Sequence, residues 1–427
     1  MRCALTILSL LIGGAACREP VVGASSDLRL ALPGSFGTLD GTDASGYGIW
    51  AEDLLYETLL TVGTDGELRP RLASRWEPAG PGQLRVWLRP GATFSDGAPA
   101  DPKTVAEALE TTDLRGKADG ESLVITSKNP GLPPELVATM TNVLRPTPGG
   151  PAGTGAFAIS SREATRAVLR RRAAAPPGAV EAVHVTAYHS GREALAHVLR
   201  GDEDLLPQID GRSAEFFAGM PRLQVVRAPN PLTVLINFGK GLDRETRRAL
   251  ARALPLNEIG HAAFGDGCRP WHHRLPSAPL PPGPPLEILT HAEDPEYVRA
   301  ALAIRRALGG RGGEVRKVSA NEIARKITTG EGDLLLGSAT TWPEGMLALH
   351  LHSAAGATNF LRYSNPAVDA AFEAGDAGRA LAALDEDPPL LLVCSRERLG
   401  VVTTRVRNPQ LGPWGALESL ESWELAR

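Results

Sequence analysis

The sequence predicts a mixed α/β fold, and three observations support this. Strand-like and helix-like segments alternate between residues 286 and 337, the pattern of a parallel sheet with helical crossovers. The chain has 427 residues, which is enough for two or three domains. Hydrophobic residues make up 43% and charged residues 22%, ordinary usage for a globular protein. We therefore expect several packed cores and no extended disordered region.

The alternating segment is the clearest part of the pattern. Its strands are expected at 286–290, 314–318 and 333–337. Asp294 and Pro295 open the first intervening helix, as N-cap and first helical residue. Ser319 and Glu322 form a capping box that begins the second helix. The five prolines between 279 and 285 predict a stiff connector that leads into this unit.

The rest of the chain shows shorter patterns. Alternation of apolar and polar residues, or short apolar runs, predict strands at 28–32, 83–89, 123–126, 157–159 and 184–188. Helical spacing and capping residues predict helices at 46–60, 101–109, 191–200 and 243–254. The proline-rich stretch 130–151 is expected to be a loop.

Residues 1–16 have the pattern of an export signal. Arg2 supplies a positive charge, residues 4–12 form an apolar run, and small residues follow. The run is shorter than the roughly 20 residues that a membrane-spanning helix needs. The Ala-Ala-Cys motif that ends at Cys17 resembles a bacterial lipobox, which implies cleavage before this residue, acylation of its thiol and a tether over 17–26. We expect an exported lipoprotein, with plain secretion as the alternative.

The charge balance argues against nucleic acid as a partner. Lys and Arg number 45 against 49 Asp and Glu, for a formal net charge of −4. Phosphate backbones are bound by concentrated basic surfaces, which this composition does not indicate. The strongest cationic run is Arg170-Arg171-Arg172, which we interpret as a solvated strand end.

Catalytic motifs are missing from the sequence. It contains no G-x-S-x-G, S-x-x-K, H-E-x-x-H, Walker A or G-x-G-x-x-G segment. We therefore expect no enzyme and no cofactor.

Two pairs of histidines are candidate metal ligands. His272 and His273 follow Trp271, while His350 and His352 are two residues apart and would share one face of a strand. Polar loop histidines without a metal are the alternative interpretation.

Two cysteines remain after Cys3 and Cys17 are set aside. An exported protein meets an oxidising environment, so Cys268 and Cys394 are a possible disulfide. A disulfide needs Cα atoms within about 7 Å of each other, and a separation of this length in the sequence leaves the pairing open.

An ordered series of motifs indicates a family. The first block consists of residues 56–60, 65–77 and 88–97, and it is followed by GTGAF at 153–157, RRAL at 247–250 and NFLRYSNPAVD at 359–369. The series resembles the family 5 extracellular solute-binding proteins, which serve ABC importers of peptides, opines, nickel chelates and some sugars.

The resemblance implies a two-lobe periplasmic-binding-protein clamp of type II-like architecture. Mixed sheets flanked by helices would form each lobe, and an extra subdomain would extend the first. The implied boundaries are 27–230 for lobe I with its subdomain at about 45–150, 240–395 for lobe II, and 400–427 for a C-terminal return to lobe I. The chain would cross between lobes near 229–237 and 399–405.

The resemblance also implies where a ligand would bind. Peptide-binding members carry an Asp for the ligand's ammonium group in the loop that aligns with 338–344. Thr341 stands at that position, with the carboxylate of Glu344 nearby. The expected ligand contacts are Leu39, Asp40, Trp271, Thr340, Thr341, Trp342, Glu344 and Asn359.

The function implied by the family is capture of a peptide-like solute and delivery to an ABC permease with its ATPase subunits. A monomer is expected. Alternatives are a binder of nickel or a metal chelate that uses the four histidines, a scaffold that has lost solute binding, and an envelope enzyme built on the same scaffold.

Overall fold

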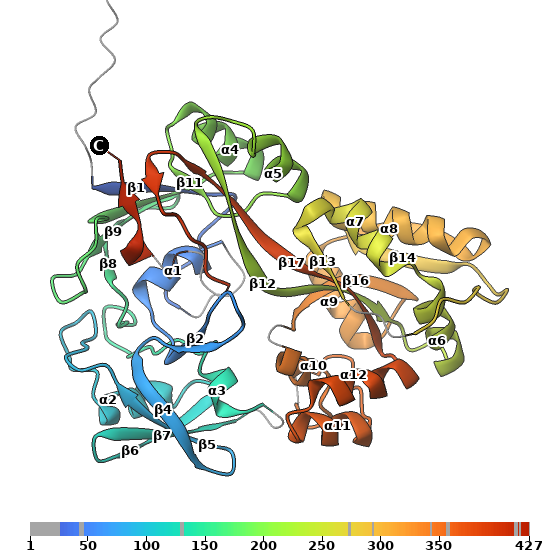
Figure 1. The fold of residues 1–427 in the computed structure, drawn as a ribbon, viewed down its shortest axis with the longest axis horizontal. Coiled ribbons are helices and arrows are strands. Elements are labelled where there is room, and N and C mark those ends of the chain that lie inside the picture. The colour runs from blue at the N-terminus through green and yellow to red at the C-terminus, as the bar shows by residue number, and fades with distance from the viewer. Residues whose placement is uncertain are drawn as a thin grey trace, which may run out of the picture.

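One continuous sheet runs through the whole molecule. Its strand order is β15-β14-β16-β12-β17-β11-β1-β10-β9-β8, and β13 pairs with β17 outside this path. Two long strands, β12 (Leu223–Phe238) and β17 (Leu390–Thr403), pass from one half to the other and are called the crossing strands below (Figure 1). The structure is a computed structural model, which describes residues 26–41, 47–128, 132–271, 275–292, 294–341, 344–355, 359–413, 417 and 420–426.

Lobe I contains the N-terminal strand and its neighbours in the sheet. β1 pairs in parallel with β10 and β11, whereas β9 and β8 continue the sheet in antiparallel fashion. The elements of this lobe are β1 (Asp27–Leu32), α1 (Ile49–Leu55), β8 (Phe157–Arg162), β9 (Arg166–Arg171), β10 (Ala182–Ala187), α4 (Gly191–Arg200), β11 (Leu205–Leu206), α5 (Gly211–Phe217), β18 (Val406–Arg407) and β19 (Glu424–Leu425).

Lobe II contains the alternating segment that the sequence predicts. β14 pairs in parallel with β15 and β16, and helices α8 and α9 make the crossovers. Its strands are β13 (Cys268–Pro270), β14 (Leu286–His291), β15 (Gly312–Val318) and β16 (Leu334–Thr340). Its α-helices are α6 (Arg244–Ala253), α7 (Leu256–Phe264), α8 (Pro295–Leu308), α9 (Ala320–Thr329), α10 (Ala348–Leu351), α11 (Pro366–Glu373) and α12 (Ala377–Glu386).

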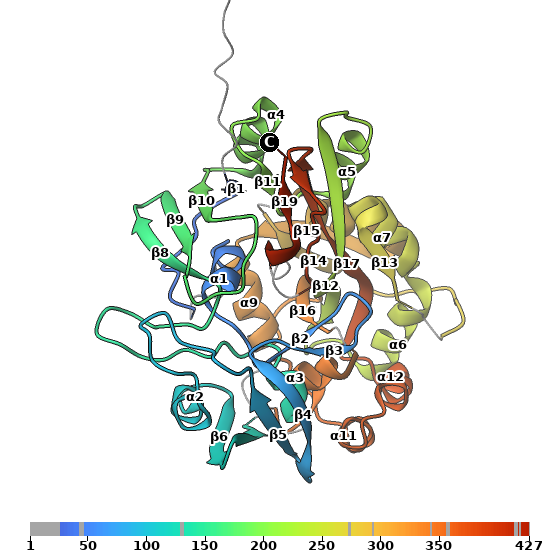
Figure 2. The ribbon, with the colours of Figure 1, turned by 60° about the vertical axis from the view of Figure 1, so that its left-hand side comes forward.

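A subdomain extends lobe I at one end of the molecule (Figure 2). It is built on a four-stranded antiparallel sheet of order β4-β5-β7-β6, covered by α2. Its elements are β2 (Leu60–Val62), β3 (Leu68–Pro70), β4 (Ala73–Gly80), β5 (Gln83–Leu88), α2 (Pro102–Leu109), β6 (Leu114–Asp119), β7 (Ser122–Ser127) and α3 (Pro134–Val137).

Each lobe has an apolar core of its own. One cluster packs β1, α1 and β9 of lobe I, and another packs α6, α7 and α8 against the sheet of lobe II. A third cluster contains residues from both 59–152 and 339–390, so apolar packing also links the subdomain to the α10–α12 side of lobe II. The fold class expected from the sequence, a two-lobe α/β clamp with a subdomain, is confirmed, while the exact domain boundaries stay a prediction.

The expected helix at 46–60 is wrong in its length. The helix spans only Ile49–Leu55, and Leu60–Val62 is a strand. Tyr56 ends the helix in an extended conformation (φ −127°, ψ 136°), and its hydroxyl donates to the carbonyl of Leu39 at 2.9 Å. Beyond Tyr56 the backbone bonds to distant segments, with the N–H of Leu60 donating to the carbonyl of Ala138 and the N–H of Arg71 donating to the carbonyl of Leu59, so tertiary pairing replaces a continued helix.

One further prediction needs correction. The stretch expected as a loop contains the short helix α3, which begins at Pro134. No helix among the described segments is long and apolar enough to span a bilayer.

Candidate functional site

The crossing strands change their pairing where they pass between the lobes. Leu223–Pro229 pairs with Glu397–Thr403, and regular pairing resumes at Thr233 with Ser395. Pro229 and Pro231 lack the N–H groups that a continuous ladder needs. The interrupted ladder turns the two faces of this segment towards different surroundings.

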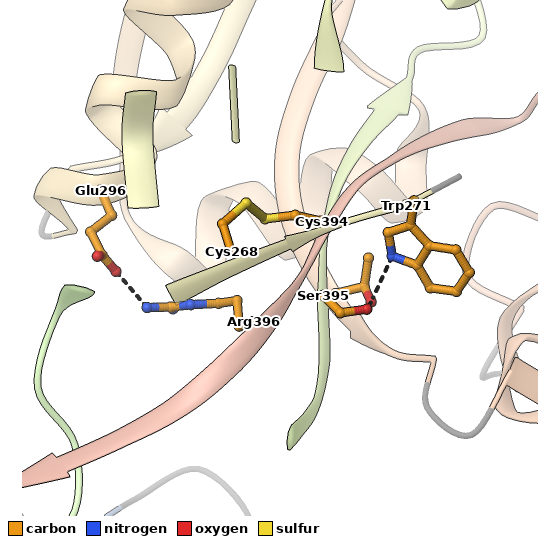
Figure 3. The surroundings of a disulfide bond; sticks show 7 residues. Cys268, Trp271, Glu296, Cys394, Ser395 and Arg396 are labelled. Carbon is orange, nitrogen blue, oxygen red and sulfur yellow. Dashed lines mark hydrogen bonds and ion pairs between the residues drawn. A yellow bond between two sulfur atoms is a disulfide. The ribbon is translucent and has the colours of Figure 1, made fainter. Parts of the chain in front are cut away.

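On one face, Thr233 collects a group of hydroxyls. Its Oγ1 lies 2.5 Å from Oγ1 of Thr341 and 3.2 Å from Oγ of Ser395. The indole Nε1 of Trp271 donates to the same oxygen at 3.3 Å (Figure 3). Thr233 and Thr341 are fully buried, so these hydroxyls satisfy one another inside the protein.

On the other face lies a cavity of about 680 Å³ between the lobes, called the interlobe pocket below. Lobe I contributes Asp210 and the N-terminal ends of α4 and α5, and lobe II contributes the N-terminal end of α8. The charged side chains that line it are Arg192, Asp210, Asp294, Glu296, Arg299 and Arg396.

An ion pair forms the wall of the interlobe pocket nearest the crossing strands. Arg396 on β17 donates through Nη2 to Oε2 of Glu296 on α8, and Figure 3 shows the two side chains pointing towards each other. Glu296 is buried, with 6% of its surface exposed, and burial raises the pKa of its carboxyl in spite of the nearby Arg396. The pair therefore places a carboxylate and a guanidinium side by side in a poorly solvated position.

Two more carboxylates are held at helix N-termini in the pocket wall. Asp210 accepts hydrogen bonds from the backbone N–H groups of Arg212 and Ser213, and Asp294 accepts from Glu296 and Tyr297. Burial opposes ionisation of Asp210, but a hydrogen bond from the hydroxyl of Ser213 at 2.6 Å and those from the backbone N–H groups outweigh it and lower the pKa of this carboxyl. Burial lowers the pKa of the neighbouring His291, so its neutral form is favoured. The pocket thus presents fixed negative charges next to guanidinium groups.

A disulfide lies beside the ion pair. Cys268 on β13 is bonded to Cys394 on β17, with Cα atoms 5.5 Å apart (Figure 3). The sequence left this pairing open, and the fold brings the two residues together through the pairing of β13 with β17. The bond anchors the lobe II end of a crossing strand.

Two residues predicted to contact ligand, Leu39 and Asn359, make hydrogen bonds within the protein. Leu39 is buried at a positive φ of 52° and supplies its carbonyl to Tyr56. Asn359 is buried and bonds to His352 and Tyr363 within its own loop. Neither of them lines the interlobe pocket, and their role as ligand contacts stays a prediction.

The other residues predicted to contact ligand lie in different parts of the structure. Thr341 and Trp271 belong to the Thr233 group, and the carbonyl of Thr340 bonds to Nε2 of His350 at 3.1 Å. Asp40 is half-buried. Glu344 begins a 3₁₀ turn at Glu344–Leu347, with a side chain outside the described positions. Trp342, His272, His273 and Cys17 lie outside the described residues.

The histidine pair that is described does not converge. His350 is in the last turn of α10 and His352 is its C-cap, where residues two apart point in different directions. His352 is buried and accepts from the backbone N–H of Ala354 through Nδ1. Within the described segments, no group of three or more His, Cys, Asp or Glu side chains is arranged to hold a metal ion.

Sequence reasoning missed the charged residues of the interlobe pocket. Asp294 was recognised only as a helix cap, while Asp210, Glu296 and Arg396 gave no motif. The available signal was a set of acidic residues in first turns of helices, but such residues are common and usually only cap the helix.

The chain is similar to known proteins in structure but not in sequence. No protein-family model matches it, and no curated protein matches it in sequence. Solved structures do match over nearly their whole length. The fold is that of two-lobe solute-binding proteins.

Three of these structures illustrate the range. The oligopeptide-binding protein AppA from Bacillus subtilis, in complex with a nonapeptide, has a TM-score of 0.72 and 14% identity, over 94% of this chain and 99% of its own. AgaA from A. tumefaciens R10, in complex with agropinic acid, has 0.74 and 18%, over 94% and 99%. NikA from Brucella suis, in complex with Fe(III)-EDTA, has 0.75 and 17%, over 93% and 99%.

Proposed function

We propose that this chain is a solute-binding protein of family 5 that captures a small peptide-like solute between its lobes. The observation that supports it is the interlobe pocket, whose walls come from both lobes and contain carboxylates as well as guanidinium groups. A zwitterionic solute needs both charges at once. Its ammonium group suits Asp210 or Asp294, and its carboxylate suits Arg299 or Arg396.

Capture would work by a shift in population. A solute that contacts Asp210 of lobe I and the α8 end of lobe II favours the closed arrangement by the difference in its affinity for the closed and open forms. The crossing strands supply the connection about which the lobes would move. This mechanism involves no chemical step, in keeping with the proposal that the protein is not an enzyme.

The remaining parts of the proposal come from the family resemblance and the N-terminal sequence. The protein would be exported, anchored at the membrane through acylated Cys17, monomeric, and served by an ABC permease with its ATPase subunits. Domain boundaries at 27–230, 240–395 and 400–427 belong to the same proposal.

A metal chelate is the second candidate for the solute. The structural similarity to NikA supports it. The described His350 and His352 do not favour it, because Nε2 of His350 and Nδ1 of His352 already bond to the protein backbone and the two rings do not converge.

The experiment begins with native mass spectrometry of protein purified from its own host, which identifies a trapped solute. Calorimetric titrations with di- and tripeptides, agropinic acid and nickel–histidine then compare the solute classes. Asp210→Asn keeps the helix cap but removes the charge, and we expect about tenfold weaker binding of a zwitterion. Glu215→Gln, on the exposed side of the same helix α5, is the matched control and should bind as the wild type does.

The proposal is overturned if no solute of these classes binds, or if the two variants lose affinity equally. Binding of nickel–histidine alone would reject the peptide-like solute in favour of the chelate.

A further inference from the structure

A second cavity, of about 550 Å³, lies between the body of lobe I and its subdomain. It is called the arginine pocket below. Five guanidinium groups line it, against three carboxylates, and it shares no lining residue with the interlobe pocket: the cations are Arg69, Arg71, Arg89, Arg171 and Arg172, and the carboxylates are Asp53, Glu57 and Glu421.

Three of these cations already have carboxylate partners. Arg71 pairs with Asp53 at 2.6 Å, Arg89 with Glu57 at 2.9 Å, and Arg69 with Asp65 at 2.8 Å. The carboxylates of Asp53 and Glu57 in the cavity wall are thereby paired with arginines.

Arg172 is held by carbonyl groups alone. Its guanidinium donates to the backbone oxygens of Gly155, Thr93 and Thr154 at 2.7, 3.0 and 2.8 Å. Carbonyls satisfy its N–H groups but do not cancel its charge. Glu57 favours the cation, although the two side chains form no direct ion pair. Burial lowers the pKa of Arg172, which shows that the surroundings disfavour the cation.

Arg171 also donates to backbone carbonyls, but one of its nitrogens makes no hydrogen bond. It donates through Nε to Val180 at 2.8 Å and through Nη1 to Pro176 at 2.9 Å, and it lies over the ring of Phe157. Its Nη2 is buried without a hydrogen-bond partner. Glu181 and Glu421 are close enough to favour the charged form, yet neither makes an ion pair with Arg171, and burial lowers the pKa of the guanidinium.

A buried hydroxyl completes the pattern. Thr154, which is 2% exposed, lines the same cavity, and its Oγ1 has no hydrogen-bond partner. A buried donor without a partner is costly, and a bound molecule that brings an acceptor into the cavity would remove that cost. Asp53 lines the same cavity, and its Oδ2 is a buried acceptor without a hydrogen-bond partner.

We propose that the arginine pocket binds a small oxyanion of the phosphate or carboxylate type. Arg171 and Arg172 supply guanidinium groups that form no direct ion pair with the carboxylates around them, and Nη2 of Arg171 with Oγ1 of Thr154 supply donors. The partnerless oxygen of Asp53 favours an anion that also carries a hydroxyl, such as hydrogen phosphate or a hydroxy acid. This site goes beyond solute capture, because it lies outside the interlobe pocket.

The test measures binding of inorganic phosphate and of citrate by calorimetry, at constant ionic strength set with chloride. The wild type should bind at least one of the two saturably. Arg171→Gln should bind at least tenfold more weakly, about the value of one charge-assisted hydrogen bond. Arg170→Gln is the matched control, because Arg170 is the exposed neighbour on the same strand β9, and it should bind as the wild type does.

Thr154→Val keeps the test informative if Arg171→Gln does not fold. Since Oγ1 has no partner, the anion-free variant should be as stable as the wild type or more so, while its anion affinity falls. Asp210→Asn, in the interlobe pocket, should leave anion binding unchanged. Absence of saturable binding of both anions, or equal losses in Arg170→Gln and Arg171→Gln, would overturn the proposal.

Discussion

At Glu296, burial and ion pairing act in opposite directions. Arg396 favours the carboxylate, but burial is the larger effect and raises the pKa of this carboxyl. A group whose pKa is higher in the folded protein adds stability in its protonated form. That contribution is present below the pKa of the unfolded chain and is lost as the pH rises through the pKa of the folded state.

Glu296→Gln tests this sign, because Gln resembles the protonated acid at every pH. The free energy of unfolding of the wild type, measured relative to this variant, should fall as the pH rises from 4 to 7. Urea titrations at several pH values measure it. Glu258→Gln, at an exposed position on α7, is the control and should show a flat difference. A wild-type advantage that grows with pH would show that the ion pair outweighs burial.

The three arginines of the run Arg170–Arg172 also differ from one another in burial. The interpretation of the whole run as a solvated strand end holds for Arg170, which is exposed, and is wrong for Arg171 and Arg172, which are half-buried. Alternation along β9 separates Arg170 from Arg171, but the strand ends at Arg171 and does not place Arg172. Only the fold decides that Arg171 and Arg172 both meet the subdomain.

At the scale of an element, the disulfide that packs against helix α7 restricts which residue can occupy position 260. A Cβ at Gly260 would lie 2.5 Å from Sγ of Cys268 and 3.5 Å from Sγ of Cys394. Ala is the better helix former by up to about 1 kcal/mol, but the contact with the nearer sulfur would force a shift. Glycine at this position lets the helix approach the disulfide.

We predict that Gly260→Ala destabilises the oxidised protein by about 1–3 kcal/mol. In a Cys268→Ala/Cys394→Ala background the sulfurs are gone, and the same change should be neutral or stabilising by up to about 1 kcal/mol. The double cysteine variant itself should lose about 3–5 kcal/mol, because the bond closes a long loop. Denaturant unfolding of the four proteins gives all three values, and equal effects of Gly260→Ala in both backgrounds would reject the explanation.

At the scale of the whole molecule, one sheet extends through both lobes. The crossing strands are the part of it that runs from one lobe into the other. Lobe I and lobe II each have a core of their own, and the interrupted ladder lies between them. Such a connection permits rotation of one lobe against the other, but the apolar cluster that links the subdomain to the α10–α12 side of lobe II would have to rearrange as the lobes move.

Small-angle X-ray scattering tests this movement. The radius of gyration should fall when the solute that binds the interlobe pocket is added, and it should not fall for Asp210→Asn at the same solute concentration. Phosphate, which we assign to the arginine pocket, serves as a further control and should not change it. An unchanged radius in the saturated wild type would mean that the lobes do not close on the solute.

The sequence by itself determined the features that depend on near neighbours. Asp101, Asp243 and Ser319 each cap a helix by accepting from a backbone N–H three residues ahead, and the strand–helix alternation of 286–337 forms the predicted parallel unit. Such interactions are local, so the spacing of residue types is enough to predict them.

Tertiary structure alone decided which distant residues share a site. Asp210, Glu296 and Arg396 meet at the interlobe pocket, and Cys268 meets Cys394, although each comes from a different segment of the chain. The burial of Arg171 and Arg172, without carboxylate partners, depends on how lobe I meets its subdomain. Charge and burial at such places follow from packing between elements, which residue spacing along one chain does not encode.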